Sequence, residues 1–277
     1  MLRDRAREEK VSVNLVLKEQ VHLLALDYLF KAGAFNHLVF QGGTALRIVY
    51  QGVRYSEDLD FVLRQGHQKF WTRFSEVLEK LPSYLERFLL FAGDIRLKTQ
   101  KKTETFQRFV LTMKIDAFHM QDRTQVEVAH VPSYENESLI IRGGDLPVSP
   151  AVRAEKPLEI LADKLTAFGS REYVKGRDIW DIYFLTATMG LAVDEKTLEL
   201  VKWKISDYRS SAAAFAARFE KNLSIFEEKG GGILKTEMER FLPSVYQHQF
   251  RKEYRTIGDS VLRLLRSFFE GWKKSET

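Results

Sequence analysis

Two aspartates, Asp58 and Asp60, have the residue type and the spacing to bind divalent cations. They lie in the segment SEDLDFVL, residues 56–63, which has the apolar content of a β-strand. Because side chains alternate between the two faces of a strand, both carboxylates should lie on one face, with their Cα atoms about 6.5 to 7 Å apart. The buried face of this strand would consist of Leu59, Phe61 and Leu63.

A pair of carboxylates on a solvated strand needs no ligand, and this is the simpler alternative. Here the pair lies within an apolar segment, where an unpaired carboxylate is costly. Mg²⁺ prefers oxygen ligands and is commonly bound by one or two carboxylates together with substrate phosphates. Two such ions, about 3.5 to 4 Å apart, stabilise the attacking and leaving oxygens of phosphoryl transfer. The spacing of Asp58 and Asp60 therefore favours metal-dependent phosphoryl chemistry.

A glycine turn precedes the two aspartates and must position part of the same site. The apolar run at residues 38–40 predicts a short buried strand, Gly42 and Gly43 predict a tight turn, and residues 44–50 have the spacing of a helix. The expected local order is strand, glycine turn, helix and aspartate strand.

These residues resemble the nucleotidyltransferase signature of the polymerase-β-type superfamily, and specifically the AbiEii/AbiGii toxin family of bacterial toxin–antitoxin and phage-defence systems. The first signature consists of Gly42, Gly43, Thr44, Ser56, Asp58 and Asp60. A second signature of that family is similar to ADKLTA, residues 162–167, followed by RDIWDIY, residues 177–183. The resemblance extends in order over residues 38–185.

The resemblance implies roles for individual residues. The implied nucleotide-binding residues are Gly42, Gly43, Thr44, Ser56, Lys164 and Asp178. The implied catalytic residues are Asp58, Asp60, Lys164 and Asp181, and the implied cofactor is Mg²⁺. The third metal ligand would be Glu127, where the family usually has aspartate, and Asp116 is the competing candidate.

Two of the second-signature residues also have a simpler explanation. Lys164 could be a surface lysine whose stem covers the core. Asp178 could complement the partial positive charge at a helix N-terminus. Asp181 lies three residues further along the same helix face and is harder to explain by capping.

The implied reaction is the transfer of NMP from an NTP to RNA, with the 3′ end of tRNA as the favoured acceptor and a block of translation as the outcome. A cognate antitoxin would be the protein partner. Two alternatives stay open: transfer of NMP or phosphate to a protein or small molecule, and a catalytically silent nucleic-acid-binding protein. The intact Asp58 and Asp60 pair argues against the silent protein.

The composition is that of a globular chain. The 277 residues are 44% hydrophobic and include no cysteine, which excludes disulfides and thiolate metal sites. No run reaches the roughly 18 consecutive apolar residues of a membrane span, and the first residues have no apolar core of a signal peptide. We therefore expect a cytoplasmic protein with no membrane partner.

The element pattern predicts an α/β fold with two parts. Residues 1–150 would form a nucleotidyltransferase domain with a small mixed sheet, and residues 151–277 a helical domain. The expected strands are 106–118 and 124–131, joined by a turn at 121–123 and followed by a loop at 132–150. The expected helices are 4–33 as one or two, 68–81 ending at Pro82, 84–91, one beginning at 153–157, 178–189, 197–203, 210–223, 234–242 and 244–272, with breaks at Gly230–Gly232 and Pro243.

The positive charge is uneven. Residues 196–277 contain 16 basic and 11 acidic residues, so this part carries the whole net charge of +5. We expect it to contact RNA phosphates through residues such as Lys202, Lys204, Arg251, Lys252 and Arg255. A second basic cluster comprises Arg96, Lys98, Lys101 and Lys102, for which a solvated hairpin tip is the favoured interpretation and a phosphate contact the alternative. The solitary histidines His22 and His37 are interpreted as structural.

Overall fold

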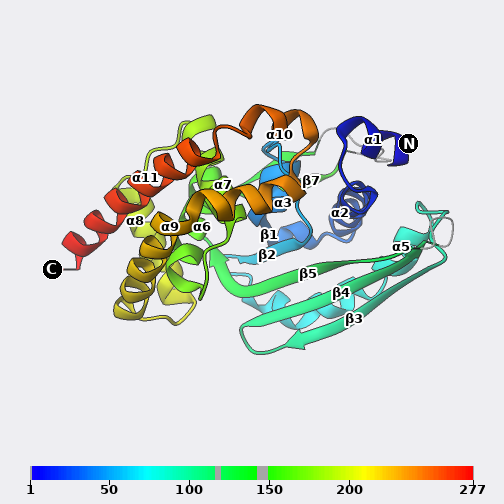
Figure 1. The fold of residues 1–277 in the computed structure, drawn as a ribbon. Helices are drawn as coiled ribbons and strands as arrows, with labels where there is room; N and C mark the ends of the chain where they lie inside the picture. The colour runs from blue at the N-terminus through cyan, green and yellow to red at the C-terminus, as the bar shows by residue number, and fades with distance from the viewer. Residues whose placement is uncertain (1, 116–119, 142–148, 277) are drawn as a thin grey trace. The chain divides into compact units, whose positions relative to one another are not determined.

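The computed structural model describes residues 2–115, 120–141 and 149–276. Its contacts group the chain into two units. The sheet unit comprises Met1–Gln51 and Tyr55–Glu155, and the helical unit comprises Gly52–Arg54 and Lys156–Thr277. The predicted fold class is confirmed, because a mixed sheet with helices forms one unit and helices form the other (Figure 1).

The sheet formed by the described residues has seven strands in the order β3-β4-β5-β2-β1-β7-β6. The strands are β1 (Leu38–Gln41), β2 (Leu59–Arg64), β3 (Asp94–Lys102), β4 (Phe106–Ile115), β5 (Met120–Ser133), β6 (Asn136–Ile140) and β7 (Ala151–Glu155). The sheet is mixed, since β1 runs antiparallel to β2 but parallel to β7, and β2 runs parallel to β5.

The local order predicted around the glycine turn is confirmed. Strand β1 leads directly into helix α3 (Gly42–Ile48), and β2 follows after a loop. The side chains predicted for the buried face of β2 are at most 1% exposed: Leu59, Phe61 and Leu63. Val62 is buried as well, because it packs with Val39 of β1 in a small cluster on the other face.

The first predicted helix is two helices, α1 (Leu2–Glu9) and α2 (Val13–Lys31). Ser12 separates them, and its hydroxyl accepts a hydrogen bond from the N–H of Leu15 at the start of α2. The shorter helical segments of this unit are η1 (Ala34–Asn36), η2 (Gln68–Arg73), α4 (Phe74–Leu78) and α5 (Leu81–Glu86). The single helix predicted at 68–81 is therefore wrong. Pro82 lies in the first turn of α5, where its missing N–H is tolerated.

Four expectations about this part of the chain are also wrong. The segment containing Arg96 and Lys98 is no hairpin tip but strand β3, paired along its length with β4. The turn predicted at 121–123 lies inside β5, and these three residues pair with residues 112–114 of β4. The loop predicted at 132–150 contains β6, and Arg153 lies in strand β7 rather than in a helix.

The helices of the helical unit are α6 (Pro157–Ser170), α7 (Gly176–Tyr183), α8 (Glu195–Asp207), α9 (Ala212–Phe241), α10 (Ser244–Phe250) and α11 (Tyr254–Ser275). A π-helical segment, Phe184–Thr188, follows α7. Helix α9 runs through Gly230–Gly232, so the break predicted there is wrong. Its aromatic side chains pack in the core, as the contacts of Phe219 with Phe168 and Phe269 illustrate. No helix in the described part of the chain is both long and apolar enough to cross a membrane.

Candidate functional site

Gly42 brings the glycine turn against the aspartate strand. It begins α3 with a φ of 78°, a left-handed conformation that glycine adopts without the penalty of other residues. A Cβ built on Gly42 would lie 2.8 Å from Oδ2 of Asp60. Both the backbone and the space beside the carboxylate therefore require glycine, and the two halves of the first signature touch.

Asp58 and Asp60 are half-buried, Asp58 just before β2 and Asp60 within it. The backbone N–H of Gln125 donates to Oδ1 of Asp58 at 3.3 Å. The hydroxyl of Thr44, which is 1% exposed, donates to the carbonyl oxygen of Asp58. Thr44 therefore fixes the backbone that carries this carboxylate. Ser56, two residues earlier, is half-buried too.

Glu127 lies beside Asp60 on the neighbouring strand, because β2 and β5 pair with these two residues in register. Adjacent residues in register project to the same face of a sheet. Oε1 of Glu127 accepts a hydrogen bond from Nε of Arg108 at 2.6 Å. The competing candidate, Asp116, lies outside the described residues.

The donor set is suited to a hard cation. In the described part of the chain, no three histidine, aspartate or glutamate side chains converge as a metal cluster. Mg²⁺, however, is commonly held by one or two carboxylates while substrate phosphates and water complete the octahedron. The half-buried pair Asp58 and Asp60 fits that mode. To become a third ligand, Glu127 would have to break its ion pair with Arg108 and bind the metal ion instead.

A buried histidine supports the segment before Asp58. Nε2 of His22 lies 3.1 Å from the carbonyl oxygen of Glu57 and 2.8 Å from Oγ1 of Thr124. Burial lowers the pKa of His22 to about 4, so its ring is neutral at pH 7. Lys18 forms ion pairs with Glu57 at 3.0 Å and with Asp122 at 3.5 Å. These contacts from α2 hold the backbone that precedes the aspartate pair.

The second-signature residues form a buried ionic network in the helical unit. Nζ of Lys164, on α6, lies 3.1 Å from Oδ1 of Asp178 and 2.8 Å from Oδ2 of Asp181, both on α7. The guanidinium of Arg54 holds Asp181 through two hydrogen bonds of 2.6 Å. Arg171 pairs with the other oxygen of Asp178.

All members of this network are charged at neutral pH. Burial opposes the ionisation of Asp178, but Lys164 and Arg171 outweigh it and lower the pKa of Asp178 to about 2. Burial likewise disfavours charge on Asp181 and Lys164, yet their opposite charges lower the pKa of Asp181 and raise that of Lys164. Removing ions from water is costly, so such networks are retained mainly at functional sites or where they fix a unique packing.

The sequence analysis identified neither Arg54 nor Arg171 of this network. The side chain of Arg54 is 6% exposed, and its partner Asp181 is 127 residues away in the chain. The only local signal is a basic residue between Val53 and Tyr55, shortly before the aspartate strand. No spacing rule connects that position to α7.

The predicted site residues thus form two groups, each assembled within its own unit. The group of the sheet unit is Gly42, Gly43, Thr44, Ser56, Asp58, Asp60 and Glu127. The group of the helical unit is Lys164, Asp178 and Asp181, to which the structure adds Arg54 and Arg171.

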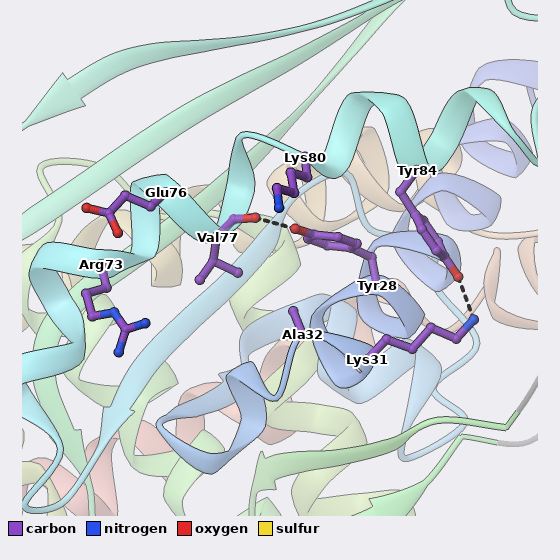
Figure 2. Close-up of a pocket in the computed structure, with 8 residues that line it drawn as sticks. All are labelled: Tyr28, Lys31, Ala32, Arg73, Glu76, Val77, Lys80 and Tyr84. Atoms are coloured by element: carbon purple, nitrogen blue, oxygen red, sulfur yellow. Dashed lines mark hydrogen bonds between the residues drawn. The ribbon is translucent and has the colours of Figure 1, made fainter.

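A pocket of about 470 Å³ in the sheet unit lies apart from these residues (Figure 2). Tyr28 and Tyr84 line it, and both side chains are already engaged: the Tyr28 hydroxyl donates to the Val77 carbonyl at 2.5 Å, and Lys31 donates to the Tyr84 hydroxyl at 2.7 Å. None of the predicted site residues lines this pocket.

One lysine predicted to contact RNA is buried in the core instead. Lys204 is fully buried, and its Nζ lies 2.6 Å from Glu159 and 3.0 Å from Asp163. Its charge therefore joins α8 to α6. Lys202 pairs with Glu276 at 3.0 Å. The prediction for Lys204 is wrong because a charge count does not distinguish surface cations from core ones.

Two solved structures resemble the whole chain, and both are from Helicobacter pylori. The protein JHP933 is 17% identical, with a TM-score of 0.52 and coverage of 96% of each chain. A candidate nucleotidyltransferase is 16% identical, with a TM-score of 0.54 and coverage of 96% of this chain and 100% of the other. At such identity the likeness concerns the fold. A comparison with curated protein sequences finds no significant match.

The sequence family described as nucleotidyl transferase AbiEii toxin of Type IV toxin–antitoxin systems matches residues 24–271. The match includes both signatures and nearly all of both units. With the glycine turn touching the aspartate strand and the ionic network formed by the second signature, the chain belongs to the AbiEii family of nucleotidyltransferase toxins.

Proposed function

We propose that this toxin transfers NMP from an NTP to the 3′ end of RNA, with tRNA as the favoured acceptor, in a reaction that requires Mg²⁺. The observation that carries the proposal is the contact between Gly42 and Asp60, beside Asp58. It joins a turn of the kind that accommodates phosphates to a pair of carboxylates of the kind that binds their counter-ion.

In this proposal the nucleotide's phosphates lie at Gly42, Gly43 and Thr44, near Ser56. Asp58 and Asp60 hold the metal, with Glu127 as the third ligand. Bound Mg²⁺ would neutralise the charge that develops on the phosphoryl oxygens. The glycines contribute by leaving room for the phosphates and by keeping Asp60 in place.

The reaction is an in-line displacement at the α-phosphate. The 3′ hydroxyl oxygen of the acceptor forms a bond to the α-phosphorus, and the bond from that phosphorus to the bridging oxygen breaks. Pyrophosphate leaves with the bond electrons, and the hydroxyl proton passes to a carboxylate or to water. Positioning and charge stabilisation supply most of the catalysis in such transfers.

The helical unit contributes a fixed positive charge in this proposal. Lys164 remains protonated and is oriented by Asp178 and Asp181. We assign Lys164 to the triphosphate or the transferred group, Asp178 to nucleotide binding and Asp181 to catalysis. Arg54 acts through Asp181 and is a positioning residue.

Modification of the tRNA 3′ end would prevent aminoacylation and so block translation. This consequence fits a toxin, because the cell that produces it would need a cognate antitoxin to survive. Because NTPs and tRNA are cytoplasmic, the proposed reaction takes place in the cytoplasm.

The test is incubation with each NTP in turn, labelled at its α-phosphate, together with Mg²⁺ and total cellular RNA. Label in RNA that survives protease and is removed by ribonuclease supports the proposal. Label in protein would instead favour transfer to a side chain. Absence of label from every product would indicate a silent binding protein.

A further inference from the structure

Strand register places a group of basic side chains on one face of the sheet. In antiparallel pairs, directly opposed residues project to the same side. Lys101 is opposite Arg108, Arg96 is opposite Thr112, and Thr112 is opposite Arg123. We call the resulting surface the basic face, and its members are Arg96, Lys98, Lys101, Arg108, Lys114 and Arg123.

The other side of the same strands is the packed side. The alternate residues of β4, which include Phe109, Leu111 and Met113, are at most 1% exposed. On the basic face, by contrast, every basic side chain except the half-buried Arg108 is exposed. The alternation therefore separates a core side from a cationic, solvated side.

The acidic residues of β3, β4 and β5 on this face are already paired. Asp94 accepts from Arg96 at 2.7 Å, and Glu127 accepts from Arg108 at 2.6 Å. Within the part of the chain that the structure describes, no ion pair is found for Lys98, Lys114 or Arg123. The face thus retains an excess of positive charge.

Protection of a sheet edge explains only part of this charge. Lysine on an exposed edge strand discourages pairing with another chain, and β3 is such a strand. Strands β4 and β5 are interior, however, and they carry Arg108, Lys114 and Arg123. Cations at interior positions need a different explanation.

The basic face begins at the candidate metal site. Asp60 is in register with Glu127, Glu127 is opposite Arg108, and Arg108 is opposite Lys101. One row across four strands therefore leads from the aspartate pair to the sheet edge, a span of roughly 14 Å at the usual strand spacing. The charge lies on the side of the sheet to which Asp60 projects.

We propose that the basic face binds the backbone phosphates of the acceptor RNA, so that the 3′ end reaches Asp58 and Asp60. This inference rests on the proposed function and specifies where the acceptor strand lies. It replaces the helical surface that the charge count favoured.

The experiment compares two variants with equal loss of charge. One replaces Lys98, Lys114 and Arg123 with glutamine, and the other replaces Arg251, Lys252 and Arg255, which are exposed in the helical unit. Affinity for labelled tRNA is measured by fluorescence anisotropy over a range of salt. NTP binding and circular dichroism establish that each variant is folded.

For the basic-face variant we expect weaker binding and a log–log salt slope flatter by up to about 2, since each phosphate contact on a single strand contributes about 0.7. The helical variant should retain the wild-type slope, and both should bind NTP normally. If the triple variant is unstable, Lys98→Gln and Arg123→Gln alone should each flatten the slope by about 0.7.

A flatter slope only in the helical variant, with wild-type protein still labelling RNA, would overturn this inference and leave the proposed function intact. Wild-type protein that neither binds nor labels RNA would overturn both.

Discussion

At the scale of single residues, Gly42 is a position where only glycine fits, because of its backbone conformation and because of the neighbouring Asp60. Gly42→Ala would put a methyl group 2.8 Å from Oδ2 of Asp60 and force alanine into a φ of 78°. We expect a loss of about 10²-fold in transfer rate, because small displacements of catalytic groups have effects of this size. The rate of label incorporation from NTP measures it.

Gly66→Ala is the matched control for backbone strain. Gly66 has a φ of 81°, but a Cβ there would meet no atom within 4 Å. Both substitutions should lower the free energy of unfolding by about 1 to 2 kcal/mol through the left-handed backbone. Equal activity of the two variants would contradict a specific contact between Gly42 and the carboxylate.

His22 makes the sheet unit sensitive to mild acid. Burial holds its pKa at about 4 in the folded state, below the usual value of 6.5 for histidine. The unfolded chain therefore binds a proton first, and stability falls as the pH falls from 6.5 towards 4. By linkage, this one group lowers the free energy of unfolding by about 2 kcal/mol between pH 7 and pH 5.

His22→Gln should remove that contribution while retaining a donor towards the Glu57 carbonyl. Urea unfolding of both proteins at pH 7 and pH 5 measures the difference. The variant should lose about 2 kcal/mol less than the wild type on acidification. An identical loss in both proteins would show that His22 does not carry the acid sensitivity.

At the residue scale, the structure brings together predicted site residues that are close in the chain, and their roles stay predictions. The glycines and aspartates of the first signature lie within 19 residues, and the structure brings Gly42 against Asp60. Arg54 was missed because its partner Asp181 belongs to a distant helix. Lys204 was misjudged for the same reason, since only the fold shows that Glu159 neutralises it.

At the scale of elements, apolar patterning predicted β1, α3 and β2 but not β3. Strand β3 is an edge strand whose sequence, DIRLKTQKK, has few apolar residues. The alternation of apolar and polar residues that predicts a strand is therefore too weak here. The segment forms a strand because it pairs with β4, which its own sequence does not indicate. The assignment of Arg96 to a hairpin tip failed for this reason.

Helix α9 provides a second example, because local propensity predicted a break at Gly230–Gly232 and the helix nevertheless continues through these residues. A Cβ at Gly230 would lie 2.4 Å from the buried ring of Phe226, whereas a Cβ at Gly232 would meet nothing within 4 Å. Gly232→Ala should therefore raise the free energy of unfolding by about 1 kcal/mol through helix propensity.

Gly230→Ala should instead destabilise the protein, because the Phe226 ring must move away from its packed position. Thermal unfolding of the two variants, compared with wild type, distinguishes these outcomes. Stabilisation by both substitutions would mean that packing around Phe226 places no constraint on α9.

At the scale of the whole molecule, the fold is shared with solved structures of very low sequence identity. The two Helicobacter pylori structures share at most 17% of residues with this chain but cover 96% of it. The sheet unit carries the glycine turn and the aspartates, and the helical unit carries Lys164 and its partners. Total charge does not distinguish surface cations from buried ones, as Lys204 shows: it is fully buried and paired with Asp163.

The central claim is that Asp58 and Asp60 hold the metal for nucleotidyl transfer. The most direct test is the rate of NMP transfer from labelled NTP to RNA by Asp60→Asn at saturating Mg²⁺, with Asp259→Asn, an exposed aspartate of the helical unit, as the control. We predict that Asp60→Asn loses about 10²-fold or more, since a neutral ligand weakens stabilisation worth several kcal/mol, and that Asp259→Asn keeps the wild-type rate. Near-wild-type transfer by folded Asp60→Asn would contradict the assignment.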